Sequence, residues 1–238
     1  MDQFMILDRE GRSFQNLPPM LCSRTDAEDL SLILTHLARF ILMKELRNPR
    51  PYSNVDDNTT SIAFRELFDV YITNQPGIRH EPEQVLEVPA FVEPDRKTFA
   101  FQLHFINKSE VDLFVHVYAL SPLWEVSQVQ FAPRDVVPPK ARAHHPAHRP
   151  RISKKFRTKI PQRMRDGYLH AEDIMKVFVT SRPTMLDILE QPSIESLLKD
   201  RTKFCYRDIE LLELYDLFPS EDWDAFNFPV RTIPRQKL

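Results

Sequence analysis

Glycine is scarce in this chain, with 3 residues among 238, and cysteine is scarcer still, with 2. The P-loop and the dinucleotide fingerprint both need several closely spaced glycines, so the sequence excludes these nucleotide sites, and we predict no cofactor. Cys22 and Cys205 do not make a disulfide framework. The N-terminal residues lack the charged start and the small-residue cleavage site of a secretory signal. We therefore expect a reducing, cytoplasmic location.

Long apolar runs are also missing. No stretch reaches the roughly 18 consecutive apolar residues that a membrane-spanning helix needs. Proline, by contrast, is abundant at 20 residues, which predicts stiff loops. A chain of 238 residues with 42% hydrophobic content can bury one large core, so we predict a single domain over residues 1–238.

No group of residues in the sequence indicates catalysis. Cys22 and Cys205 lie among large apolar or aromatic neighbours, where inert buried thiols are common. The imidazoles of His144, His145 and His148 are of the type that binds transition metals, but no acid or thiol accompanies them. We therefore predict neither an enzyme nor a metal site.

The clearest pattern is a two-residue alternation between Thr98 and Phe131. Apolar side chains share one face in each of two segments: Phe99, Phe101, Leu103 and Phe105, then Val111, Leu113, Val115 and Val117. A short polar turn at 107–110 separates the segments, which predicts a β-hairpin. His104 and His116 would be neighbours on its other face, where bonds to backbone groups are commoner than metal ligation.

The best helix signal begins at Thr25, which is the expected N-cap of a reciprocal capping box with Glu28. Apolar residues then occupy most of the helix circumference as far as Leu46. Asn48 and Pro49 end the pattern. The sequence therefore predicts a heavily buried helix over residues 25–47.

Alternating or apolar segments predict further strands at 62–72, 85–92, 123–131, 154–160, 174–180 and 224–233. Pro89 restricts its strand to a sheet edge or a bend, and Trp124 and Trp223 are expected to be packing anchors. Short helical pieces follow Pro183, and residues 208–218 form a candidate acidic helix. The predicted fold class is mainly β: an antiparallel β-sandwich with one long N-terminal helix and short C-terminal helical additions.

Charge is distributed unevenly, although the net charge is only −2. Residues 132–153 predict a basic, Pro-rich, exposed loop, because almost no large apolar side chain there can be buried. Nine basic side chains are candidates for binding an anion or a partner: Arg134, Lys140, Arg142, Arg149, Arg151, Lys154, Lys155, Arg157 and Lys159. The alternative interpretation is that these nine side chains form ion pairs with the acidic residues at 184–224 of the same chain. Phe156 is the only aromatic residue among them, so this segment by itself has no platform for stacking bases.

A resemblance to a known family rests on four parts of the chain: Leu37-Ala38-Arg39-Phe40 with Leu46-Arg47-Asn48-Pro49, residues 113–126, residues 173–184, and residues 222–232. From Thr25 to Ile233 the chain is similar to the non-catalytic C-terminal region of fungal caspase-like (metacaspase-type) proteins. In that family a protease domain precedes this region, with a His-Gly and a Cys-Gly catalytic motif. Neither motif occurs here. The resemblance implies an accessory domain of a protease system.

The sequence therefore predicts a non-catalytic accessory domain that mediates interactions. The expected partner is a caspase-like protease or one of its associates, and we expect no membrane span. Two alternatives stay open. One is anion or nucleic-acid binding through residues 134–165, and the other is a hydrolase with an unrecognised site.

Overall fold

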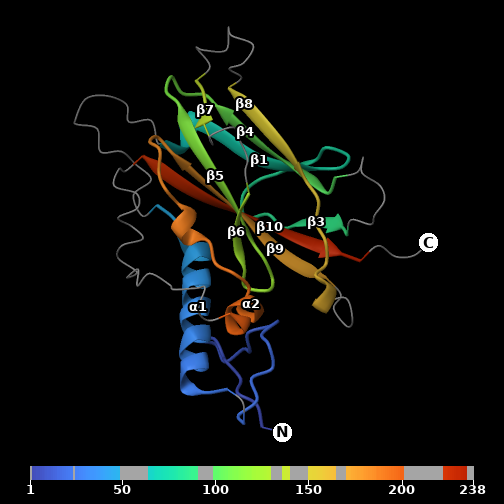
Figure 1. Ribbon diagram of the computed structural model, residues 1–238. Helices are drawn as coiled ribbons and strands as arrows, with labels where there is room; N and C mark the ends of the chain where they lie inside the picture. Colours follow the sequence, from blue (N-terminus) through green and yellow to red (C-terminus); the bar gives the residue numbers. More distant parts are fainter. Residues whose placement is uncertain are drawn as a thin grey trace.

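The computed structural model describes residues 2–23, 25–48, 64–90, 99–129, 136–139, 150–164, 170–200 and 222–234. Two sheets, mostly antiparallel, pack face to face, and one long helix lies against the outer face of the larger sheet (Figure 1). The predicted mainly β fold with a long N-terminal helix is confirmed. Within the described residues, no helix is long and apolar enough to cross a membrane.

The smaller sheet has four strands in the order β2-β1-β4-β8. Their bounds are β1 Phe68–Asn74, β2 Arg79–His80, β4 Phe101–Asn107 and β8 Arg151–Phe156. All pairs are antiparallel. The edge strands of this sheet are β2 and β8, which stand at the two ends of the order.

The larger sheet has six strands, with β3-β10-β9-β5-β6 as its main order and β7 paired to β5. Their bounds are β3 Leu86–Pro89, β5 Leu113–Leu120, β6 Val126–Val129, β7 Val136–Val137, β9 Ala171–Thr180 and β10 Trp223–Ile233. Only the β3–β10 pair is parallel. The strand that contains Pro89 lies at the edge of the sheet, as predicted. Proline has no backbone N–H to donate, so it is disfavoured in a strand that has hydrogen-bonded neighbours on both sides.

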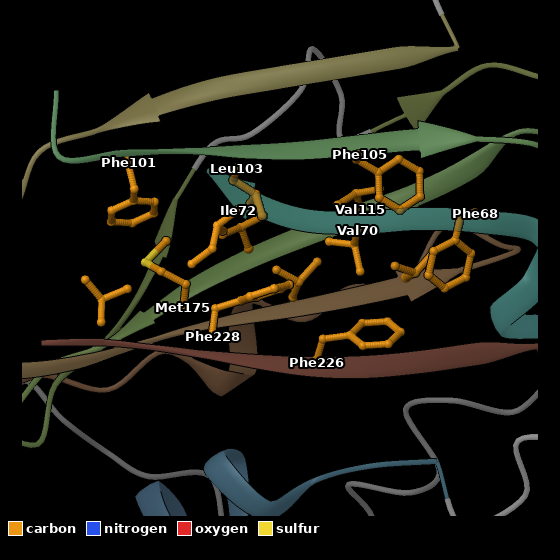
Figure 2. Packing of buried hydrophobic residues seen from close by; sticks show 14 of the residues in the cluster. Phe68, Val70, Ile72, Phe101, Leu103, Phe105, Val115, Met175, Phe226 and Phe228 are labelled. Atoms are coloured by element: carbon orange, nitrogen blue, oxygen red, sulfur yellow. The ribbon is translucent and has the colours of Figure 1, made fainter. Parts of the chain in front are cut away.

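The main core fills the space between the two sheets (Figure 2). Phe68 of β1 stacks on Phe105 of β4 and meets Phe226 of β10 edge-on, with ring centroids 5.4 and 5.7 Å apart. Alternate side chains of each strand point into this layer, and the others face outward. The sequence alternation therefore identified the buried faces of β4 and β5 correctly, although Val111, which was expected on the buried face, precedes β5 and is 53% exposed.

The predicted hairpin between residues 99 and 120 is wrong. β4 pairs with β1 and β8, whereas β5 pairs with β6, β7 and β9, so the two strands belong to different sheets. Asn107 fixes the crossing, since its Nδ2 donates to the carbonyls of Val111 and Val137 at 2.8 Å. The two apolar faces meet across the core instead of lying side by side. His104 and His116 consequently lie on opposite outer faces and are not neighbours.

The long helix, α1, runs over Ala27–Glu45 and packs in two halves. Its C-terminal half places Phe40, Met43 and Leu46 on the outer face of the larger sheet. Its N-terminal half packs Ile33 and Leu37 against the N-terminal segment and α2, which Figure 1 shows beside it. The helix is heavily buried, as predicted.

The N-cap of α1 is Asp26, not the predicted Thr25. The Asp26 side chain accepts the backbone N–H of Asp29 at 2.8 Å. Thr25 instead donates its own N–H to Leu21, which holds the chain in a turn before the helix. Both residues are good caps, and the turn decides between them.

Several other boundaries differ from the prediction. Residues 64–67 form a 3-10 turn, η1 Phe64–Leu67, so β1 starts later than expected. Trp124 lies in a turn before the short β6. The segment 132–153, predicted to be a loop, contains β7 and the start of β8. β7 forms there because Val137 packs into the main core.

The remaining helical pieces are η4 Gln162–Met164, η5 Asp187–Leu189 and α2 Ile194–Lys199. The last two match the short helical pieces predicted after Pro183. The predicted acidic helix at 208–218 and Cys205 lie outside the described residues.

Candidate functional site

Five of the nine predicted basic residues are described, and they follow one another along β8 and just beyond it. Arg151 and Lys155 are exposed on the outer face of the four-stranded sheet. Lys154 alternates to the inner face of this edge strand, and Arg157 and Lys159 follow its end. The other four, Arg134, Lys140, Arg142 and Arg149, lie outside the described residues.

The structure surrounds Arg151 with aromatic groups from other strands. The Tyr71 ring of β1 stacks on the His104 ring of β4, with centroids 4.8 Å apart and planes 16° apart. The Arg79 guanidinium of β2 lies 4.0 Å from the Tyr71 ring centroid. The strands β2, β1 and β4 thus contribute one stack of side chains, Arg79, Tyr71 and His104, on the outer face of the four-stranded sheet. We call this stack, together with Arg151 and Lys155, the cationic face.

Arg151 is positioned by this stack without being neutralised. Its Nη2 lies 3.3 Å from Tyr71 Oη and 3.4 Å from His104 Nδ1, which are long contacts to neutral groups. Lys155 lies 4.5 Å from the Phe99 ring centroid. Neither Arg151 nor Lys155 has a carboxylate partner among the described residues, whereas Arg79 also pairs with Glu81.

Burial lowers the pKa of His104, and the charges of Arg151 and Arg79 lower it further. His104 is therefore neutral at pH 7. Because Arg151 donates toward Nδ1, the ring hydrogen sits on Nε2, which is 2.9 Å from Thr73 Oγ1. An anion beside Arg151 would offset both positive charges and raise this pKa.

One titratable group that the sequence pattern did not single out is Lys176, which is completely buried on β9. Its Nζ donates to the carbonyls of Lys44 and Leu46 at 3.1 and 2.6 Å, so it caps the C-terminal end of α1. Burial lowers its pKa to about 7. In the sequence, Lys176 is the single charged residue inside the apolar run 174–180. In the structure, its side chain holds the C-terminal end of α1 on the sheet.

Asp173, also on β9, is half-buried, and its side chain makes no hydrogen bond or ion pair among the described residues. Burial raises its pKa from 3.8 to about 6. Between these values the folded chain binds more protons than the unfolded chain, so stability falls as the pH rises through this window.

Replacing Asp173 by Asn should therefore raise the free energy of unfolding at pH 7, by up to about 3 kcal/mol. Urea unfolding at pH 7 and pH 4 measures the effect, and the gain should shrink at the lower pH. Asp187→Asn, at an exposed position, is the control and should stay within about 0.5 kcal/mol of wild type. A loss of stability at pH 7 would show that the carboxylate makes a favourable contact.

The described residues contain no cluster of three or more His, Cys, Asp or Glu side chains that could hold a metal ion. His144, His145 and His148 lie outside them. Cys22 is an exposed free thiol, so the expectation of a buried thiol is wrong for this residue. No protein-family model matches the sequence, and no curated protein is significantly similar to it. The resemblance to the caspase-associated region stays a prediction from the residues alone.

Proposed function

We propose that this chain is a non-catalytic interaction domain whose cationic face binds an extended acidic peptide segment of a partner protein. The observation that carries the proposal is the state of Arg151. This guanidinium is exposed, held in place by Tyr71 and His104, and has no ion pair among the described residues. A positioned but unpaired guanidinium is the natural complement of a carboxylate.

The edge position of β8 supports a peptide as the occupant. β8 pairs with β4 on one side, and no other described strand pairs with it. An extended segment can add to such an edge through main-chain hydrogen bonds, while its alternate side chains meet those of β8. Arg151, Ser153 and Lys155 present this alternation outward, so two acids four residues apart would face two cations.

The aromatic groups of the cationic face favour a peptide over nucleic acid. The Tyr71 ring is already in contact with two planar groups, the Arg79 guanidinium and the His104 ring. A ring with these contacts offers less surface on which a base can stack. The aromatic residues of this face therefore serve to position the arginines.

Binding should be measured by calorimetry with a β-favouring peptide that carries Glu at two positions four residues apart, and with its Gln counterpart. The double change Arg151→Gln and Lys155→Gln should weaken binding of the Glu peptide about tenfold or more. Lys154→Gln is the control, since it removes one positive charge from the same strand on its other face. NMR should also show a higher His104 pKa in the complex.

Three results would overturn the proposal. The Gln peptide could bind as well as the Glu peptide, Lys154→Gln could weaken binding as much as the double change, or single-stranded DNA could bind more tightly than the peptide. Added salt should weaken the complex because the paired charges are exposed. A caspase-like protease, or one of its associates, is the partner that the resemblance suggests for this role.

A further inference from the structure

A groove lies beside α1 on the opposite side of the molecule from the cationic face. It is bounded by the N-terminal segment, by α1, and by the outer face of the six-stranded sheet. Its volume is about 590 Å³, within the roughly 300–1,000 Å³ of small-molecule sites. Its walls are largely apolar, with Phe14, Phe40, Ile41, Pro122, Trp124 and Pro229 among the lining residues.

Three aromatic rings form one connected wall of the groove. Phe14 and Phe40 both meet the Trp124 ring edge-on, with centroids 5.4 and 5.0 Å away. The indole N–H of Trp124 is already bonded to the carbonyl of Gln15 at 2.9 Å. The ring is therefore fixed in orientation and offers an apolar surface to a ligand.

Backbone strain is concentrated around this groove. Three non-glycine residues in the described part of the chain have positive φ: Asn16 at 62°, Glu83 at 67° and Trp124 at 65°. All three line the groove. Asparagine adopts this conformation readily, but each of the other two costs about 1 kcal/mol or more, and such strain gathers at ligand sites.

The conformation of Trp124 is imposed by hydrogen bonds. Its carbonyl lies 2.7 Å from His36 Nε2 and accepts from Gln191 Nε2 at 3.3 Å, while its N–H donates to Ser121. Burial lowers the pKa of His36, so the ring is neutral and donates from Nε2. Helix α1 thus holds the aromatic wall of the groove in place through His36.

The charged lining residues comprise three acids and two bases: Glu83, Glu172, Asp173, Lys44 and Arg231. Arg231 is bonded to Glu172, and Glu83 is paired with Arg47 at 2.8 Å. These charges are compensated within the protein, and the largely apolar walls make the burial of a charged ligand costly.

We propose that this groove binds a small uncharged ligand with two or more apolar rings. The rings pack against Trp124 and Phe40. Such a site is separate from the cationic face and does not depend on it.

Two fluorescent probes that share one scaffold test the proposal on the full chain. N-phenyl-1-naphthylamine is uncharged and has the rings, and it should bind with saturation at one site per chain. The anionic 8-anilinonaphthalene-1-sulfonate has the same rings and should bind about tenfold more weakly, because its charge must leave water for the apolar walls.

Two variants place the probe in the groove. Val85 lines the groove and is 49% exposed, so Val85→Arg should obstruct it and weaken probe binding about tenfold. Val111→Arg is the matched control, since Val111 is 53% exposed and is not among the lining residues, and it should leave the affinity unchanged.

Absence of saturable binding at one site, or equal affinity in Val85→Arg and wild type, would overturn the site. Equal or tighter binding of the sulfonate would overturn the requirement for an uncharged ligand.

Discussion

Replacing Phe40 by Asp should abolish cooperative folding of this protein. Phe40 is buried where α1 meets the outer face of the six-stranded sheet, in a cluster with Tyr118, Phe178 and Trp223. The change removes a large apolar contact and puts a carboxylate in its place, which should cost more than about 4 kcal/mol. That is a large part of the roughly 5–15 kcal/mol by which domains are stable. Circular dichroism melting and size-exclusion chromatography should show an unfolded or aggregated product.

Leu34→Asp is the matched control, because it makes the same kind of change in the middle of the same helix. Leu34 is 51% exposed, so this variant should melt cooperatively, within a few degrees of wild type. A Phe40→Asp protein that stays monomeric and melts like wild type would show that α1 is a detachable arm. The wide apolar surface of the helix would then need another partner.

The second large effect concerns Lys176 and pH. Its folded pKa is about 7, against an ordinary value of 10.5. Between these values the unfolded chain binds one proton more, so the free energy of unfolding should rise with pH by about 1.4 kcal/mol per unit. Below pH 7 both states are protonated and the burial cost is constant. The neutral amine still donates, so the bonds to Lys44 and Leu46 survive deprotonation.

Urea unfolding of wild type and Lys176→Met at pH 7 and pH 9 isolates this contribution, because other groups titrate alike in both proteins. Wild type should gain about 2.5 kcal/mol relative to the variant between these two values. Lys199→Met, at a side chain 71% exposed on α2, should show no such difference. Parallel pH profiles for wild type and Lys176→Met would mean that the ammonium stays charged at pH 9, held by the helix carbonyls.

The sequence by itself determined which faces of the regular strands and of α1 are buried, although it did not mark the buried Lys176 or Val137. The two-residue alternation identified Leu103 and Val115 as inward-facing, and the apolar stripe of α1 as covered, because side-chain direction follows the local period of each element. Pro89 likewise marked an edge strand through its missing donor. Each of these properties depends on neighbours along the chain.

Only the tertiary structure decided which strands pair and what surrounds each candidate side chain. The alternation in residues 99–120 fits a hairpin and two facing sheets equally well. The hydrogen bond from Asn107 to the carbonyl of Val137, 30 residues away, favours the two facing sheets. The basic run seemed to lack aromatic support, yet Tyr71 and His104 reach Arg151 from 80 and 47 residues away. The groove beside α1 joins segments that are still more widely separated. The entropy of closing a loop changes slowly with its length, so a local pattern leaves many long-range pairings nearly equal, and packing of the whole core distinguishes them.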